Sequence, residues 1–269
     1  MGLTGGYREL DHYPRRSWFR RDPYRRFSLY DDRPRTGYLA GVRHPWPSLI
    51  VVTLLLALYE LGVARLTPPG GESLRAGVEL WLRQWLQQSG PVPPVVIPAA
   101  VVGLLALATL WRWSDRPGYI FTVVFGVLLE GVVFGLGLWT LCLNAPAILE
   151  HAGLTPMAVG GPNPKLVTYV GVGVYEEVIF RLIAFAWLAR VLRVALVPTI
   201  AAIPMAVLAS AAVFALAHHF VQTDPFVPGV FLTRMLVGVY CALLYWLRGL
   251  GVAVGAHVVY DIVVGVPAQ

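Results

Sequence analysis

Two adjacent glutamates and an arginine interrupt an apolar stretch in the second half of this sequence. Residues 176–181 read EEVIFR, so Glu177 and Arg181 stand four positions apart, with the acid before the base. At that spacing they share one helical face and can form an ion pair. Glu176 points about 100° away around the same helix and has no partner there. The spacing therefore predicts that Glu176 is the freer acid, suited to act as a general base and then as a general acid.

Two further clusters contain imidazoles. Phe214 and His218 stand one helical turn apart in FALAHHF, whereas His219 is rotated away from their shared face. His257 and Asp261 are one turn apart in GAHVVYD, where a carboxylate can orient an imidazole or share a cavity with it. Each cluster alone is also compatible with a purely structural role. Three such clusters on separate apolar segments predict a site assembled between helices.

The segments that carry these residues are long and apolar. The chain has 269 residues, of which 57% are hydrophobic and 13% charged. A bilayer is crossed by about 20 apolar residues, and uninterrupted apolar runs favour helices over a closed barrel. The predicted fold class is all-α, a polytopic transmembrane helical bundle. Seven spans are expected, at residues 48–66, 92–111, 119–143, 166–189, 195–217, 226–247 and 249–266.

Residues 1–46 are predicted to form a basic, cytoplasmic N-terminal arm. They hold ten of the 20 arginines against five acids, and basic residues next to a span tend to stay inside. The net charge of +6 comes mostly from this arm, so it indicates membrane topology and no nucleic-acid partner. With the N-terminus inside, seven spans place five more arginines inside: Arg112, Arg116, Arg190, Arg193 and Arg248.

The remaining chain is expected to divide into two parts. Residues 47–118 would contain the first two spans and an amphipathic interfacial helix at 72–88, and residues 119–269 a catalytic membrane domain. In the interfacial helix, charged side chains lie opposite apolar ones such as Trp81 and Trp85. The charged residues are Glu72, Arg75, Glu79 and Arg83. Residues 144–165, with four prolines, are expected to be a loop.

Cysteine and lysine usage adds two smaller expectations. Cys142 and Cys241 fall inside expected spans without CxxC spacing, so they are interpreted as apolar filler. Lys165 is the only lysine against 20 arginines, which suggests a GC-rich prokaryotic genome. An integral protein of a prokaryotic plasma membrane is therefore expected.

The motifs EExxxR, FxxxH and HxxxD, in this order, resemble those of the CAAX protease and bacteriocin-processing family of intramembrane proteases. Its eukaryotic members, the type II CAAX prenyl endopeptidases, remove the last three residues of prenylated proteins. The resemblance covers roughly residues 120–266. It implies an intramembrane endopeptidase that acts on a membrane-embedded peptide or a lipidated protein C-terminus.

The resemblance also implies a role for each motif residue. Glu176 would activate the attacking water with the help of His218, and His257 with Asp261 would stabilise the oxyanion. The other motif positions, expected to have supporting roles, are Glu177, Arg181 and Phe214. The eukaryotic enzymes carry asparagine where this chain has Asp261, and an ionised aspartate would oppose a developing oxyanion. We therefore expect Asp261 to hold His257 and to stabilise its imidazolium form, which donates to the oxyanion.

No cofactor is expected, with zinc as the alternative. The family is often described as metalloproteases, and Glu176, His218 and His257 could supply one oxygen and two nitrogen ligands to zinc. However, the chain has no HExxH, and the side chains of the adjacent His218 and His219 diverge. A metal-free, glutamate-dependent mechanism is therefore favoured.

Two other functions remain open at this stage. The first is a non-catalytic membrane scaffold or immunity factor with the same fold. The second is a proton-coupled transporter, although no pair of broken helices in matching halves supports it. Its relay would consist of Glu60, Glu130, Glu176, Glu177, Arg181 and Arg234. Glu60 and Glu130 are the isolated acids of the first half, and Arg234 is expected to pair with Glu130 or another buried acid.

Overall fold

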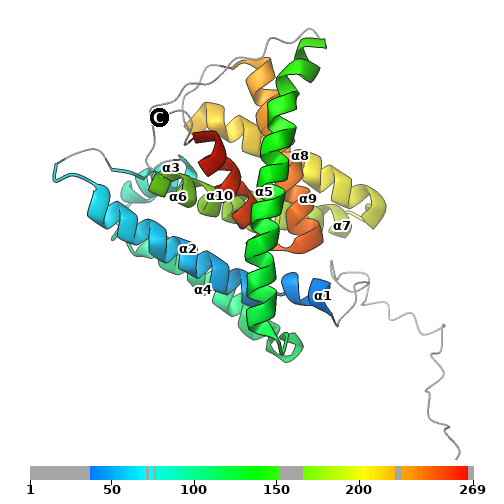
Figure 1. Cartoon of the computed structure of the whole chain (residues 1–269), viewed down its shortest axis with the longest axis horizontal. Coiled ribbons are helices and arrows are strands. Elements are labelled where there is room, and N and C mark those ends of the chain that lie inside the picture. Colours follow the sequence, from blue (N-terminus) through cyan, green and yellow to red (C-terminus); the bar gives the residue numbers. More distant parts are fainter. Residues whose placement is uncertain (1–36, 71–72, 76, 152–165, 222–225, 266–269) are drawn as a thin grey trace, which may run out of the picture. The chain divides into compact units, whose positions relative to one another are not determined.

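The fold is taken from a computed structural model, which describes residues 37–70, 73–75, 77–151, 166–221 and 226–265. Most of the expected basic arm and the second part of the expected loop lie outside these residues. Within them every regular element is a helix, which confirms the all-α fold class (Figure 1). Residues from Arg33 onward belong to one compact unit.

The helices match the seven expected spans in order. The first half contains α1 (Tyr38–Val42), α2 (Pro45–Leu66), α3 (Gly77–Gln87), α4 (Val96–Trp111), the short 3-10 helix η2 (Trp113–Asp115) and α5 (Ile120–His151). The second half contains α6 (Leu166–Glu177), the π-helix η3 (Val178–Phe185), α7 (Ala186–Val194), α8 (Thr199–Val221), α9 (Pro228–Arg248) and α10 (Leu250–Gly265). The fourth expected span is the continuous run of α6, η3 and α7.

Several helices have the length and surface of membrane spans. Among the described residues, α2, α5, α8 and α9 are long and apolar enough to cross a bilayer, and α4 and α10 are shorter apolar helices. On α2, Leu54, Leu58 and Leu61 are more than half exposed and share one outward face. A contiguous apolar face of this kind is stable against lipid and not against water. The chain is therefore an integral membrane protein.

The expected loop at 144–165 is wrong in its first part. Helix α5 continues past Pro146 and ends at His151. A proline inside a helix removes one backbone hydrogen bond and tends to kink or break the helix, which is why the prolines of this segment favoured a loop. The last residues of the expected arm, from Tyr38 onward, are likewise helical. The cap of α2 is His44, whose side chain accepts a hydrogen bond from the backbone N–H of Trp46.

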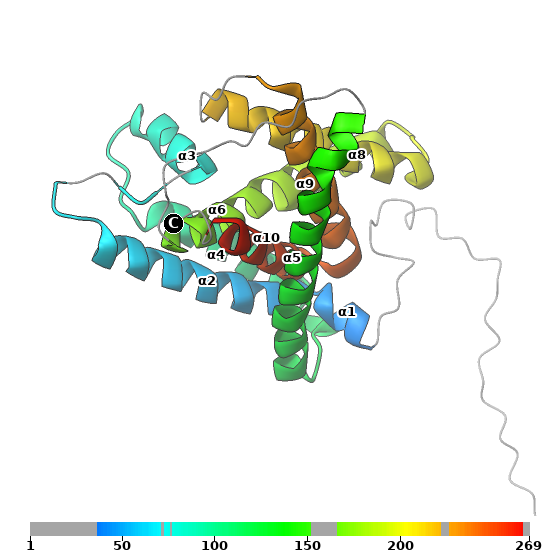
Figure 2. The same ribbon diagram turned by 45° about the horizontal axis from the view of Figure 1, so that its top comes forward.

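Helix α10 packs on α5, α6 and α9 (Figures 1 and 2). Glycines permit close approach at two of these contacts. A Cβ on Gly255 of α10 would lie 3.2 Å from the Cα of Gly131 on α5, and a Cβ on Gly173 of α6 would lie 2.7 Å from a methyl group of Val258. Because α6 and α10 approach so closely, the residues that follow Gly173 and those around Val258 come into contact.

Candidate active site

The structure brings all seven expected site residues together from four elements. Glu176 and Glu177 end α6, and Arg181 lies in η3. The other four residues lie in the last turns of α8 and in α10: Phe214, His218, His257 and Asp261. Both glutamates, Arg181 and His257 are buried. A buried cluster of ionisable groups inside an apolar bundle is a functional site by default.

The ion pair between Glu177 and Arg181 is present, as the spacing predicts. The guanidinium Nη1 lies 3.1 Å from Glu177 Oε1, and Nη2 donates to the carbonyl oxygen of Gly238 at 3.3 Å. Arg181 also lies over the ring of Phe214, 4.5 Å from its centroid. The turn that contains Arg181 is a π-helix, a rare conformation that is frequent at functional sites. The apolar periodicity of residues 166–189 gave no signal for it.

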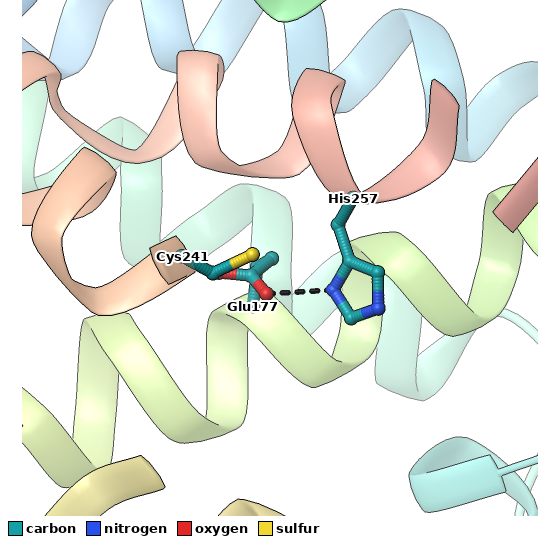
Figure 3. A group of neighbouring side chains, drawn as sticks. All are labelled: Glu177, Cys241 and His257. Atoms are coloured by element: carbon teal, nitrogen blue, oxygen red, sulfur yellow. Dashed lines mark hydrogen bonds and ion pairs between the residues drawn. The ribbon is translucent and has the colours of Figure 1, made fainter. Parts of the chain in front are cut away.

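Glu177 has a second partner that helical spacing could not predict. The Nδ1 atom of His257 donates to Glu177 Oε1 at 2.7 Å (Figure 3). Figure 3 also shows Cys241 of α9 beside the same carboxylate. Glu177 therefore fixes both the orientation and the tautomer of His257, as a carboxylate does for a functional imidazole.

Glu176 lies between the two imidazoles. Its Oε1 is 3.8 Å from His218 Nε2, and its Oε2 is 3.8 Å from His257 Nε2. Both distances exceed that of a direct hydrogen bond. Oε2 accepts no hydrogen bond from the described residues, although it is buried. The geometry agrees with the expectation that Glu176 is the freer of the two acids.

Phe214 and His218 form one rigid unit at the end of α8. The Nδ1 atom of His218 donates to the carbonyl oxygen of Phe214 at 2.9 Å, which leaves Nε2 facing Glu176. The ring of Phe214 makes edge contacts with His218 at 4.9 Å and with His257 at 6.0 Å between centroids. Phe214 thus supports both imidazoles. The adjacent His219 is turned away, as expected, and packs against Phe226.

Asp261 faces Nε2 of His257, whereas the hydrogen bond that holds the ring is made by Nδ1. Its Oδ2 lies 3.7 Å from Nε2, the nitrogen that also faces Glu176. The bond that holds the ring is made by Glu177, so the expected orienting role of Asp261 is not seen in the hydrogen bonds. Carboxylates nevertheless face both ring nitrogens, an arrangement that favours a doubly protonated imidazolium.

Two sets of residues are candidates for metal ligands. Among the described residues, one group has its ligand atoms within 4.8 Å of one another, namely Glu177, Cys241 and His257 (Figure 3). Its carboxylate already binds the guanidinium of Arg181, which would repel a divalent cation. The atoms of the expected set, Glu176, His218 and His257, do not form a second such group among the described residues, although each imidazole Nε2 lies 3.8 Å from an oxygen of Glu176.

An apolar pocket lies beside the polar cluster. Its volume is about 380 Å³, and its walls come from α3, η3 and α8. The lining residues are Val78, Trp81, Ile179, Phe180, Val213, Leu216 and Ala217. Phe180 packs edge to face on Phe214 with 5.3 Å between ring centroids, and Ala217 precedes His218 in the chain. The pocket is thus adjacent to Phe214 and His218 of the polar cluster.

The two acids of the first half are not isolated, contrary to expectation. Glu60 forms an ion pair with Arg75 at 2.6 Å, and Glu130 forms one with Arg248 at 3.5 Å. Arg234 was expected to pair with Glu130 or another buried acid; Glu130 pairs with Arg248, and the charge of Arg234 acts on the buried Glu176. Because Glu60 and Glu130 are neutralised by cations of their own, they do not support a proton relay through the bundle.

The interfacial helix also differs from its prediction in one respect. The described part of it, α3, is amphipathic, but its charged face packs inward on the protein. Glu79 and Arg83 are buried, whereas Trp81 and Trp85 are 48% and 56% exposed. The apolar face is therefore free to contact lipid, and the charged face takes part in the fold.

Comparison with known proteins finds one similarity, in the second half of the chain. Residues 164–263 match the family model described as Type II CAAX prenyl endopeptidase Rce1-like. No curated protein and no solved structure matches the chain. The matched segment runs from the start of α6 into α10 and contains all seven residues of the polar cluster. Over this segment the chain is similar to the CAAX protease family.

Proposed function

We propose that the protein is an intramembrane endopeptidase that hydrolyses a peptide bond of a membrane-associated or lipidated substrate. The observation that carries this proposal is the placement of Glu176, with one carboxylate oxygen 3.8 Å from each of two imidazole Nε2 atoms. These distances suit water molecules that bridge the groups. A water held by a carboxylate and an imidazole is ready for deprotonation.

In the proposed reaction, Glu176 removes a proton from the water, and the resulting hydroxide adds to the scissile carbonyl carbon. His218 accepts a hydrogen bond from the water at Nε2, because its Nδ1 proton is engaged by the Phe214 carbonyl. The protonated Glu176 then transfers its proton to the leaving nitrogen as the peptide bond breaks. The products are a carboxylic acid and an amine, which become a carboxylate and an ammonium group by proton exchange, and Glu176 is ionised again.

His257 is proposed to stabilise the oxyanion of the tetrahedral intermediate. Its Nδ1 proton is held by Glu177, so a proton on Nε2 is the one available to a developing negative charge. Asp261, 3.7 Å from Nε2, favours that protonated form. An imidazolium cannot ligate a metal through Nε2, which is why we propose a metal-free mechanism. Arg181 neutralises Glu177, so that the general base remains Glu176.

The substrate is proposed to place an apolar group in the pocket between α3, η3 and α8. The pocket is lined by apolar residues and lies next to Phe214 and His218. An apolar side chain or a lipid anchor would gain free energy by leaving water for such a site. A substrate of this kind also arrives through the bilayer, which suits a site built between membrane helices.

The proposal is tested with purified protein and a library of quenched peptides that carry lipidated C-termini. Wild type is compared with Glu176→Gln and with wild type after strong zinc chelation. We expect cleavage by wild type, a loss of cleavage in the variant and no effect of chelation, with mass spectrometry of the products locating the broken bond. Cleavage that disappears on chelation would contradict the metal-free mechanism. A folded wild type that cleaves neither lipidated nor plain membrane peptides would favour the scaffold alternative.

A further inference from the structure

Four charged residues join α3 to α2 and to the start of α4. Arg75 makes two bonds to Glu60 of α2, at 2.6 and 2.9 Å, and a third to Glu79. Glu79 also accepts from Arg83 at 2.8 Å, and Arg83 donates to the carbonyl oxygen of Pro94 at 3.1 Å. We call Glu60, Arg75, Glu79 and Arg83 the α3 anchor. Paired bonds between an arginine and a carboxylate fix geometry as well as distance.

The α3 anchor is largely shielded from solvent. The side chains of Arg75 and Arg83 are each 9% exposed, and that of Glu79 is fully buried. Although burial lowers the pKa of Arg75, its bonds to Glu60 and Glu79 raise that pKa above the ordinary value, so the guanidinium is charged. A buried charge network has few alternative arrangements, because each partner that moves leaves a charge uncompensated.

The first residue of α3 lies against the carboxylate of Glu176. Gly77 has a φ of +60°, and a Cβ at this position would lie 3.3 Å from Glu176 Oε1. Thr168 of α6 donates to the carbonyl oxygen of Leu74 at 3.0 Å, which ties the segment before α3 to the helix that carries Glu176. Tyr175, the neighbour of Glu176, contacts Glu60 through its hydroxyl at 3.5 Å. Two contacts thus connect this region with Glu176: Gly77 packs against its carboxylate, and Glu60 of the α3 anchor contacts the neighbouring Tyr175.

We propose that the α3 anchor is a positioning device for the reaction, which holds the first turn of α3 against Glu176 and thereby fixes the carboxylate between the two imidazoles. The anchor and Gly77 lie outside residues 164–263, so the matched family segment does not include them. The inference rests on the proposed function, because it requires Glu176 to be the general base. Arg75 and Gly77 are then positioning residues, and neither touches the substrate.

One test uses a matched pair of glycines. Gly77→Ala places a methyl group against Glu176, whereas Gly70→Ala has a similar φ of +71° and no atom within 4 Å of the new Cβ. Both variants place an alanine at a positive φ and therefore carry similar backbone strain, but only Gly77→Ala disturbs the carboxylate of Glu176. We expect kcat of Gly77→Ala to fall by roughly 10- to 100-fold with little change in KM. Gly70→Ala should retain the wild-type kcat.

A second test uses a matched pair of ion pairs. Arg75→Lys keeps the charge but loses the paired bonds to Glu60, whereas Arg248→Lys alters the single contact at 3.5 Å between Arg248 of α9 and Glu130 of α5. Thermal unfolding measures the structural effect of each change, and kcat per folded enzyme measures positioning. We expect kcat to fall by roughly tenfold in Arg75→Lys and to be unchanged in Arg248→Lys.

The outcomes separate this inference from the proposed function. If the wild type hydrolyses the peptide library and Gly77→Ala and Arg75→Lys match their controls in kcat, the positioning role is wrong and the proposed function stands. If Gly77→Ala fails to fold, kcat of Arg75→Lys compared with kcat of Arg248→Lys decides whether the α3 anchor positions Glu176. If the wild type hydrolyses no peptide, the proposed function fails first, and the positioning role fails with it.

Discussion

The two adjacent glutamates differ in task because they differ in partners. Oε1 of Glu177 lies 3.1 Å from Arg181 and 2.7 Å from His257, so the charge of Glu177 is compensated and this oxygen is engaged by both partners. Glu176 faces two imidazoles at 3.8 Å without a direct bond to either. The same residue type therefore serves as an orienting acceptor at one position and as a proposed general base at the next.

Replacing Asp261 tests whether the charge or the orientation of the His257 ring matters more for catalysis. In Asp261→Asn the ring stays in place, because Glu177 makes the bond that orients it. The variant loses the negative charge 3.7 Å from Nε2, so imidazolium is less favoured. We expect a reduction of kcat by about tenfold, with unchanged thermal unfolding. Complete loss of turnover in a folded Asp261→Asn would mean that ring charge matters more than ring orientation.

Replacing Glu177 should have a larger effect. Glu177→Gln leaves an amide oxygen that can accept from His257, but it removes the charge that compensates the buried Arg181. An uncompensated buried charge costs about 3–5 kcal/mol, so the midpoint of thermal unfolding should fall. We expect kcat to fall by about 10- to 100-fold as the support of His257 weakens. The double variant Glu177→Gln, Arg181→Met should recover stability without recovering kcat; recovery of both would assign Glu177 a purely structural role.

Sequence reasoning selected residues that lie together in the structure, but it did not predict all of their contacts. Spacing within one helix predicts the Glu177–Arg181 pair, since residues four apart are neighbours by geometry alone. The bond from His257 to Glu177 joins residues 80 positions apart, and no helical period contains that information. The proximity of Cys241 to the same carboxylate was missed for the same reason.

At the scale of elements, α3 shows what an amphipathic pattern can and cannot predict. The pattern correctly separated a charged face from an apolar one, but it did not tell which face contacts the protein. Burial of Glu79 and Arg83 depends on Glu60 in another helix, which the pattern of α3 does not include. Similarly, the break from α-helix to π-helix at Val178 leaves the apolar character of the segment unchanged.

The pocket wall contributed by α3 can be tested for substrate selection. Trp81 lines the pocket, whereas Trp85, one turn further along the same helix, does not. Trp81→Ala should enlarge the pocket and change the ratio of kcat/KM between peptides with bulky and small apolar groups by roughly tenfold in favour of the bulky ones. Trp85→Ala, a change of the same size on an exposed residue, should leave the ratio unchanged. If the ratio of kcat/KM between bulky and small peptides were the same in both variants, the pocket would not be a substrate-binding site.

At the scale of the whole molecule, seven spans with a cytoplasmic N-terminus would place the C-terminus outside. This arrangement keeps the arginines between α4 and α5, in α7, and at the end of α9 on the cytoplasmic side. It also places His218 at the outer end of α8. Among the described helices, four are long and apolar enough to cross a bilayer and two are shorter apolar helices, so the number of spans and their orientation both stay predictions.

Reporter fusions test that orientation. Alkaline phosphatase is active only outside the cytoplasm, so a fusion after Gln269 should be active. A fusion after Trp113, between α4 and α5, should be inactive and serves as the control. Inactive enzyme at both positions would place the connection between α4 and α5 and residue 269 on one side, which requires an even number of spans between them.

The central claim is that Glu176 activates the water that hydrolyses the peptide bond. The most direct measurement is kcat of Glu176→Gln on the best peptide from the library, compared with Glu150→Gln, which removes an exposed carboxylate at the end of α5. Loss of a general base should reduce kcat by about 10²- to 10⁴-fold, while thermal unfolding shows an intact fold and Glu150→Gln retains full activity. A folded Glu176→Gln enzyme that turns over at the wild-type rate would contradict the account.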